Sequence, residues 1–485
     1  MEPVNYDGKS KVGAVSNIER SGGDVSRQRI KDILGQAVDG KQVEVRGWVK
    51  SKRVSKNFAF VVINDGSTQH DLQVIVDSGT AAFDVLGDCT VGSSVKILGT
   101  IKDSPGKGQQ WEVQGTAIEV IGTADPDRYP LQKKGHSLEF LREIAHIRGR
   151  TNTFGAVFRV RNQLSQLVHR YFQDRGFVWA HTPLITAGDC EGAGEQFQVT
   201  TMEPDQWKKD DLGNWNFKDD FFGEQAHLAV SGQLNGEALA LSVGDIYTFG
   251  PTFRAENSNT ARHLSEFWMV EPEMAFADLK DDMDLAEGFI RAMFSGIVES
   301  CPEEIEFLGK TYKETSAESL MKLAQEPFQR ISYTDAVDQL LKVKKFQYPV
   351  KWGNDLQTEH ERFLAEEVFK RPVIVYDYPK DIKAFYMKLN DDEKTVAAMD
   401  VLVPRVGEII GGSQREDQVD LLSARMDEVG VPQAGMEWYL DLRRYGGTPH
   451  AGFGLGFERL VQYVTGMANI RDVIPFPRVP NGITF

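Results

Sequence analysis

The stretch from Gly250 to Met274 constrains the fold of this chain more than any other. The pair Thr252-Phe253 and the hydrophobic run 267–276 fit two extended segments, and the polar run 256–263 between them fits a loop. Cations and carboxylates crowd this loop beside an aromatic, Phe267, and they are Arg254, Glu256, Arg262, His263 and Glu266. Two arginines suit an anionic phosphoryl or carboxylate ligand, because the guanidinium fork matches such oxygens in pairs. Taken alone, such a loop is more often a solvated surface with ordinary ion pairs.

Two further stretches occur with it in a fixed order. They are GFVWAHTPLIT at 176–186 and GFGLGFERL at 452–460. The three stretches resemble motifs 1, 2 and 3 of class II aminoacyl-tRNA synthetases, with Pro183 in motif 1, FRAE and RHLSEF in motif 2, and Arg459 in motif 3. A lone glycine pair would be weak evidence, but the ordered set indicates this family.

Composition excludes several other classes of protein. A chain of 485 residues exceeds what one core usually spans, so two or more domains are expected. No apolar run approaches the roughly 20 residues that cross a bilayer, and the N-terminal segment lacks the apolar core of a secretory signal. The three cysteines, Cys89, Cys190 and Cys301, have no metal or redox spacing. We therefore expect a cytoplasmic protein with no membrane partner.

The charge balance predicts selective contact with nucleic acid. A net charge of −16 argues against indiscriminate binding, which depends on neutralising phosphates. A local basic patch, KSKRVSK at 50–56, leaves a selective RNA contact open, although a solvated hairpin loop explains it equally well.

The first part of the chain has the pattern of a small barrel. Residues 1–30 are polar and predict a loosely ordered lead-in. Five segments with strand patterning follow, at 42–49, 58–64, 71–77, 94–101 and 111–122. With no long helix after the second segment, they predict an OB-fold over residues 31–122, a fold whose strand 2–3 face binds oligonucleotides.

This segment resembles the anticodon-binding domain of the aspartyl- and asparaginyl-type enzymes. The resemblance implies that Phe60 stacks on the central uridine of the anticodon, that Gln73 reads it, and that Arg53 is a basic residue of the same face. If the barrel stood alone, a core Phe60 and an exposed strand Gln73 would be the simpler interpretation.

Residues 123–150 predict a linker, because two X-Pro steps interrupt the chain before LEFLREIAHI resumes as a short helix. A longer helix is predicted over about 154–175, with one apolar stripe and Gly176 at its end. The resemblance implies that 151–485 is the catalytic domain, an antiparallel sheet flanked by helices, so the fold class is α+β. It also implies that this helix and the Pro183 strand build a homodimer interface. Two later segments, 371–379 and 384–389, predict buried strands.

The resemblance implies that the segment VSGQLNGE, 230–237, carries the choice of amino acid. Aspartate-type relatives have a lysine where this chain has Gly236, and Glu237 follows with no cation available beside it. A carboxylate accepts hydrogen bonds only, so it welcomes an amide NH₂ and repels a carboxylate side chain, while Arg415 could donate to the amide oxygen. Such a mismatch discriminates by roughly 10⁴. The resemblance implies that the asparagine site comprises Glu191, against the α-ammonium, with Ser231, Gln233, Glu237, Arg254 and Arg415.

ATP is the second substrate that the resemblance implies. Arg254 would bridge the α-phosphate and the substrate carboxylate, Arg262 and Arg459 would hold the outer phosphates, and Phe267 would stack on adenine. The implied ATP-binding residues are Arg254, Glu256, Arg262, His263, Leu264, Phe267, Glu408, Gly456 and Arg459, with Arg254 and Arg459 catalytic. Glu408 is the position that holds Mg²⁺ in the relatives. Asp400 is a second candidate with a spacing that departs by one residue, and a solvated acid pair is the alternative.

Beyond its first 30 or so residues the chain resembles the bacterial asparagine-type members of the aspartyl/asparaginyl/lysyl subgroup. This implies that ATP and L-asparagine form asparaginyl-adenylate, from which the amino acid passes to the tRNA for asparagine. Three rivals remain at this point. A non-discriminating aspartyl-type enzyme should keep the lysine, an ammonia-dependent asparagine synthetase should lack the barrel, and a non-catalytic RNA-binding paralogue should lose Arg254, Arg459 or Glu408.

Overall fold

The computed structural model describes residues 28–106, 108–132, 135–188, 196–258, 260–343 and 346–485. The chain divides into two compact units, one up to Gly135 and one from His136, and this division falls inside the predicted linker 123–150. Most of the predicted lead-in 1–30 lies outside the described residues. Its last residues belong to the first unit instead, because Gln28 bridges Val45 and the side chain of Ile30 is fully buried.

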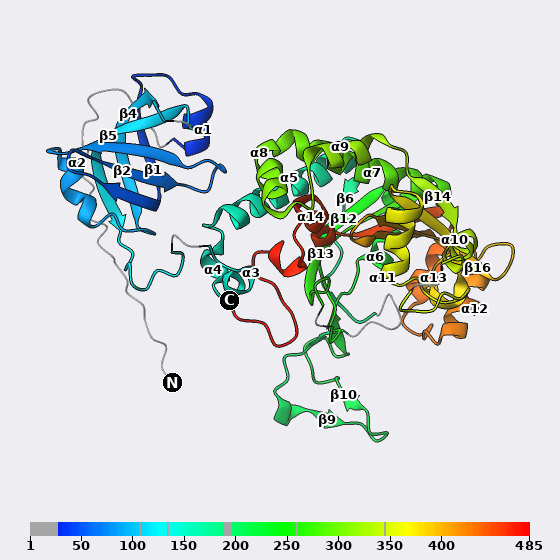
Figure 1. Ribbon diagram of the computed structural model, residues 1–485. Coiled ribbons are helices and arrows are strands. Elements are labelled where there is room, and N and C mark those ends of the chain that lie inside the picture. The colour runs from blue at the N-terminus through cyan, green and yellow to red at the C-terminus, as the bar shows by residue number, and fades with distance from the viewer. Residues whose placement is uncertain (1–27, 107, 133–134, 189–195, 259, 344–345) are drawn as a thin grey trace, which may run out of the picture. The chain divides into compact units, whose positions relative to one another are not determined.

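The first unit is a closed barrel with the strand order β1-β2-β3-β5-β4 (Figure 1). Its elements are α1 (Ile30–Gly35), β1 (Gln42–Val54), β2 (Phe58–Asn64), β3 (Leu72–Asp77), α2 (Ala81–Asp84), η1 (Val85–Gly87), β4 (Ser94–Asp103) and β5 (Trp111–Gly122). The predicted OB-fold with five strands is confirmed. Strand β1 continues beyond the predicted 49, because residues up to Val54 pair with β2, so the basic patch is mostly strand rather than loop.

Alternation along the strands builds the barrel core. Ala59, Val61 and Ile63 of β2 have no exposed surface, and neither do Leu72 and Val74 of β3. Because successive side chains of a strand point to opposite faces, the residues between them lie on the outer face of the barrel.

The second unit is built on an eight-stranded sheet with the order β14-β15-β16-β17-β18-β13-β12-β6. Its strands are β6 (Val178–Trp179), β12 (Ile246–Phe253), β13 (Glu266–Ala275), β14 (Gln329–Ser332), β15 (Val373–Pro379), β16 (Thr395–Val403), β17 (Gly407–Gln414) and β18 (His450–Gly456). The six central strands are antiparallel, and the two edge strands pair in parallel. The predicted antiparallel sheet flanked by helices is therefore confirmed, with parallel additions at both edges.

The prediction of a strand at 384–389 is wrong. This segment makes isolated bridges from Met387 to Arg415 and from Leu389 to Val396 instead of a continuous ladder. Its hydrophobic side chains are still buried, because Phe385 and Tyr386 pack in a cluster with Val230 and Tyr439. The apolar pattern thus marked a packed segment and not a strand.

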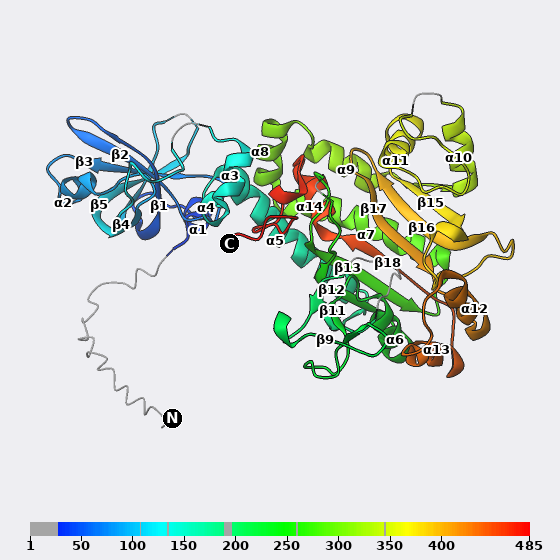
Figure 2. The same cartoon turned by 90° about the horizontal axis from the view of Figure 1, so that it is seen from below.

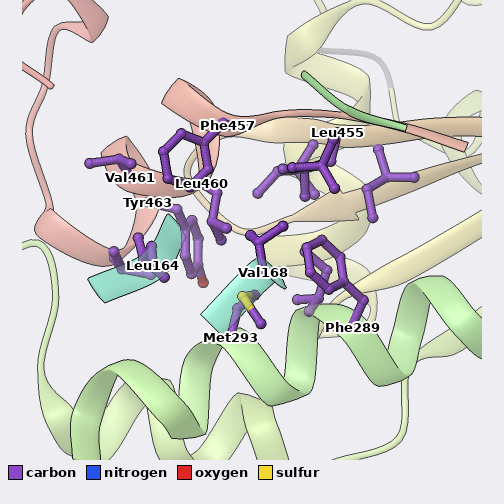
Figure 3. Packing of buried hydrophobic residues seen from close by; sticks show 14 of the residues in the cluster. Leu164, Val168, Phe289, Met293, Leu455, Phe457, Leu460, Val461 and Tyr463 are labelled. Carbon is purple, nitrogen blue, oxygen red and sulfur yellow. The ribbon is translucent and has the colours of Figure 1, made fainter. Parts of the chain in front are cut away.

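Helices α5 and α7 cover one face of the sheet. Helix α5 (Asn152–Gln173) confirms the predicted stripe, and Gly176, at φ +85°, follows its end. In α7 (Leu279–Ser300) the buried residues recur every three or four positions, as at Met283, Ala286, Phe289 and Met293. Figure 3 shows Leu164 and Val168 of α5 meeting Phe289 and Met293 of α7, below Leu455 of β18. Each fully buried side chain of this size contributes roughly 1.5–3 kcal/mol of transfer free energy.

The remaining helices and short strands complete the second unit. They are α3 (Leu138–Glu143), α4 (Ala145–Arg148), β7 (Ile185–Thr186), β8 (Gln198–Val199), η2 (Pro204–Gln206), β9 (Lys208–Lys209), β10 (Trp215–Asn216), β11 (Ala226–Leu228), α6 (Gln233–Val243), α8 (Pro302–Tyr312), α9 (Ala317–Gln325), α10 (Tyr333–Leu341), α11 (Thr358–Phe363), η3 (Leu364–Val368), η4 (Lys380–Ile382), α12 (Val419–Val429), α13 (Glu437–Arg444), α14 (Phe457–Thr465) and η5 (Ile470–Asp472). Figure 2 shows α6, α12 and α13 gathered at one side of the sheet. Among the described residues, no helix has the length and apolar character needed to cross a bilayer.

Candidate active site

A hairpin of β12 and β13 presents the charged loop 254–265. The strands pair in register from Ile246↔Glu273 to Phe253↔Glu266, and the Arg254 N–H then donates to the Ser265 carbonyl at 3.0 Å. The C-terminal segment holds the loop from outside: the Ile470 N–H donates to the Ala261 carbonyl, and the Ser265 N–H donates to the Arg478 carbonyl, each at 2.8 Å. The ends of the loop are therefore fixed by main-chain hydrogen bonds.

This loop forms one wall of a cavity, and the strand–helix junction of β18 and α14 forms another. All nine residues that the sequence predicted for ATP line this cavity, and they are Arg254, Glu256, Arg262, His263, Leu264, Phe267, Glu408, Gly456 and Arg459. The guanidinium of Arg254 lies 5.5 Å from the ring centre of Phe267, so a cation and an aromatic surface face the same space.

The electrostatics of this cavity favour an anionic ligand. Burial lowers the pKa of Arg262, and the neighbouring Arg362 and Arg459 lower it further, so like charges converge here. Burial also lowers the pKa of His263, whose Nδ1 lies 2.5 Å from the hydroxyl of Thr260. Because the cations are crowded and partly desolvated, a polyphosphate would relieve their repulsion.

Small residues keep one face of the sheet clear beside this cavity. Gly452, Gly454 and Gly456 alternate along β18 and share that face. A Cβ on Gly452 would lie 2.3 Å from the Pro272 carbonyl oxygen, and one on Gly454 would lie 2.7 Å from Cε of Met269. The glycines therefore let the side chains of β13 lie flat across the sheet, in the order Phe267, Met269, Glu271 and Glu273.

Farther along the same face, Glu237 lies at the centre of a buried hydrogen-bond network. It is fully buried on α6, and its two oxygens accept hydrogen bonds from four donors. These donors are Gln233 Nε2 at 3.0 Å and the Tyr439 hydroxyl at 2.7 Å on Oε1, and Arg443 Nη2 at 2.7 Å and His450 Nε2 at 2.9 Å on Oε2. Burial opposes ionisation, but Arg443 and His450 outweigh it and hold the pKa of Glu237 below its usual range.

Arg415 is the second centre of this hydrogen-bond network. It is buried and pairs with Glu273 through two hydrogen bonds, and its Nη1 donates to the Ser413 hydroxyl at 2.8 Å. Its Nη2 also donates at 2.8 Å to the side-chain oxygen of Gln233. A carboxamide therefore lies between Arg415, which donates to its oxygen, and Glu237, which accepts from its nitrogen.

The sequence interpretation that no cation is available beside Glu237 is wrong. Arg443 supplies one from helix α13, and sequence reasoning missed it together with Tyr439, His450 and Glu273. A weak signal existed, because Tyr439 and Arg443 stand four residues apart on one helix and His450 opens the glycine-rich strand. The partner, Glu237, is separated by about two hundred residues, which no local pattern spans.

Ser231 and Glu191 are the two other residues predicted to bind asparagine. The hydroxyl of Ser231 donates to Glu271, whose other oxygen accepts from the Gly232 N–H at 3.1 Å. This places Ser231 beside the start of α6, between the cavity that Arg254 lines and the hydrogen-bond network around Glu237. Glu191 lies outside the described residues.

The two predicted metal ligands lie close together. A Cβ on Gly411 would be 3.3 Å from Glu408 Oε1 and 3.4 Å from Asp400 Oδ1, so both carboxylates flank one point. Asp400 pairs with Lys383 at 2.8 Å, whereas Glu408 lines the cavity and accepts from Arg459. Among the described residues no group of three or more potential ligands gathers. This donor set fits Mg²⁺, which one or two carboxylates and substrate phosphates often hold, and does not fit an ion held by protein alone.

The barrel carries its own candidate site. Phe60 and Gln73 are partly exposed on the outer face, and Arg53 pairs in register with Phe60, so Phe60 is not a core residue. The side-chain nitrogen of Gln73 donates to Glu112 at 3.1 Å, and the Ser104 hydroxyl donates to the same oxygen at 2.9 Å. Glu112 thus orients the side-chain amide of Gln73.

Family models match both units. The model for class II tRNA synthetases (D, K and N) matches residues 137–480, and the model for an OB-fold nucleic acid binding domain matches residues 43–121. An asparagine–tRNA ligase of a Picosynechococcus species is 56% identical over 459 residues, 94% of this chain and 100% of that protein. One from Parabacteroides distasonis is 55% identical, over 95% of this chain and 99% of its own.

Two of the similar solved structures are also asparaginyl-tRNA synthetases. The asparaginyl-tRNA synthetase of Pyrococcus horikoshii complexed with asparaginyl-adenylate is 34% identical, with a TM-score of 0.83 over 95% of this chain and 100% of that one. The Entamoeba histolytica asparaginyl-tRNA synthetase in complex with asparaginyl-adenylate is 26% identical, with a TM-score of 0.80 over 95% and 100% of the two chains.

Proposed function

The chain belongs to the class II tRNA synthetases of the D, K and N group, and from this premise we propose that it ligates L-asparagine to the tRNA for asparagine. It is an aminoacyl-tRNA ligase. ATP and asparagine form asparaginyl-adenylate and pyrophosphate, and the asparaginyl group then passes to the 3′ end of the tRNA.

The observation that supports the choice of amino acid is the position of the Gln233 carboxamide, which lies between Arg415 and Glu237. Both oxygens of Glu237 are buried and already accept four hydrogen bonds, so a substrate amide reaches Glu237 by replacing one of those donors. The side chain of Gln233 offers the matching position, because its carboxamide has the same donor and acceptor as asparagine. We infer that the asparagine side chain takes this position once Gln233 rotates toward the α-ammonium.

An aspartate side chain does not match the same position. Its carboxylate would meet Arg415 favourably but would place a second anion against Glu237, with no proton to donate. Leaving a buried donor or acceptor unmatched supports discrimination of roughly 10⁴. Gly236 supplies no cation to reverse this preference.

The first step needs positioning rather than a protein nucleophile. The α-carboxylate of asparagine attacks the α-phosphorus, and pyrophosphate leaves from the opposite side. We assign to Arg254 the neutralisation of the α-phosphate and to Arg262 and Arg459 that of the outer phosphates, with adenine against Phe267. Their convergence in one cavity supports these assignments. Glu408, assisted by Asp400, would hold Mg²⁺, which neutralises phosphate charge when bound.

Three further assignments concern partners and location. We propose that Phe60, Gln73 and Arg53 bind the anticodon, because they share the outer face of the barrel. We propose a homodimer that buries β6, since Val178 and Trp179 are 50% and 57% exposed beside α5. A cytoplasmic location fits an enzyme that charges tRNA for translation.

Amino-acid-dependent ATP–pyrophosphate exchange tests the function. We expect exchange with asparagine and almost none with aspartate in the wild type. Exchange with aspartate at a similar rate would contradict the assignment of the Arg415–Glu237 pocket. No exchange with either amino acid would contradict ligase activity altogether.

A further inference from the structure

We call the space around the Gln233 carboxamide, between Arg415 and Glu237, the amide pocket. Helix α13 contributes two side chains to this pocket although the helix lies outside the motifs that identify the family. Tyr439 and Arg443 stand one helical turn apart and both reach Glu237. The ion pair between Arg443 and Glu237 has no exposed side-chain surface on either side. We propose that Arg443, assisted by Tyr439, is a positioning residue for amino-acid selection, which fixes Glu237 as an ionised acceptor. This inference rests on the proposed asparagine specificity.

The charges around Glu237 explain why Arg443 is needed. Two carboxylates, Glu237 and Glu273, and two guanidiniums, Arg415 and Arg443, occupy this buried space. Arg415 makes both of its carboxylate hydrogen bonds to Glu273, so its charge is matched there. Glu237 is then left to Arg443 and His450, and an isolated carboxylate at this depth would not remain ionised.

Arg443 is itself held in one orientation. Its Nε donates to the carbonyl of Glu416 at 2.8 Å, and its guanidinium lies 4.3 Å from the ring centre of Tyr439. Its Nη2 donates to Glu237 at 2.7 Å and approaches the Tyr439 hydroxyl at 3.2 Å. Because Glu416 follows Arg415 on the chain, the two guanidiniums that frame the pocket are tied to the same stretch of backbone.

The consequence for selection follows from hydrogen-bond chemistry. With Arg443 in place, Glu237 carries no proton and accepts from an amide NH₂. Without it, Glu237 takes up a proton, and its O–H donates to a carboxylate side chain. The other titratable and charged groups that face Glu237 are Arg415, which directly follows β17, Glu273 from β13, His450 from β18 and Tyr439 from α13. Loss of Arg443 should therefore relax selection toward aspartate rather than only weaken the enzyme.

The test measures kcat/KM for asparagine and for aspartate in ATP–pyrophosphate exchange. The variants are Arg443→Gln, Arg443→Lys and Tyr439→Phe, with Arg444→Gln as the matched control, because Arg444 is exposed and pairs with Asp441. We expect Arg443→Gln to lower the asparagine-to-aspartate ratio by about tenfold or more. Arg443→Lys keeps the charge but loses the Nε hydrogen bond and the stacking on Tyr439, so it should lower the ratio clearly less than Arg443→Gln does. Tyr439→Phe should lower the ratio by about threefold, and Arg444→Gln should not change it.

Several results would overturn the inference. Equal loss for both amino acids in Arg443→Gln would show a merely structural role, and so would a loss of selectivity in Arg443→Lys as large as in Arg443→Gln. If thermal unfolding shows that Arg443→Gln does not fold, Tyr439→Phe decides, and an unchanged ratio in that variant refutes the inference. Absence of asparagine-dependent exchange in the wild type would refute the proposed function instead.

Discussion

Gly452→Ala tests whether the bare glycine face of β18 is what allows the amide pocket to form. The added Cβ would lie 2.3 Å from the Pro272 carbonyl oxygen and 2.7 Å from Glu273 Oε1. A real Cβ cannot occupy that position, so either β13 or the carboxylate of Glu273 must move. Since Glu273 holds Arg415 through two hydrogen bonds, the displacement reaches the guanidinium that we propose as the donor to the substrate amide.

The expected magnitude has two parts. Overpacking in a close-packed region lowers the free energy of unfolding by about 1–3 kcal/mol. A misplacement on the order of 1 Å at a substrate-positioning group lowers kcat/KM by about a hundredfold. Both effects should appear together, because the same added Cβ causes them.

Gly250→Ala is the matched control, since Gly250 lies in the same sheet and a Cβ there meets no atom within 4 Å. Urea unfolding gives the stability of each variant, and exchange with asparagine gives its activity. Gly250→Ala should unfold at or slightly above the wild-type midpoint, because alanine is less costly to order than glycine. If Gly452→Ala matches this control in both measurements, the account of the glycine face is refuted.

Three other predictions concern separate parts of the molecule. Gln73→Ala should weaken aminoacylation but leave pyrophosphate exchange intact, and equal loss in both assays would show that the anticodon site is misassigned. Burial raises the pKa of Asp282, so its folded neutral form is favoured; the stability it contributes is present below the unfolded pKa near 3.9 and is lost as pH rises. Asp282→Asn should therefore gain stability over wild type as the pH rises above the unfolded pKa of Asp282, by up to about 1.4 kcal/mol per pH unit, and a pH-independent difference would refute this. Sedimentation should give twice the chain mass of 54.3 kDa, and an active monomer at micromolar concentration would refute the homodimer.

Local patterns predicted the parts of the fold that depend on periodicity. The strands around Phe60 and Gln73 and the stripe of α5 followed directly from spacing, because one buried face fixes the register of a strand or helix. Segment 384–389 failed the same rule, since an apolar run is buried equally well as a packed loop. Sequence alone could not distinguish these two forms of burial.

The candidate site also contains residues that the sequence predicted and residues that it did not. That most of the residues predicted for ATP line one cavity was predictable, because motifs 2 and 3 each keep their residues within a short stretch, and the sheet pairs β13 with β18. Arg443 was not predictable, because its contact with Glu237 depends on a partner from another element and on the burial of both side chains. Charge neutralisation inside a protein is a property of three-dimensional packing, and Glu237 read alone suggested a carboxylate without a cation.

The most direct test of the whole account is the charging of tRNA, with the attached amino acid identified. The purified protein, ATP and transcripts of the tRNAs for asparagine and for aspartate are incubated with both amino acids at equal concentration. We expect asparagine to be attached to the tRNA for asparagine and aspartate to be attached to neither tRNA. Attachment of aspartate at a comparable rate would contradict selection by Arg415 and Glu237, and attachment of neither amino acid would contradict ligase function.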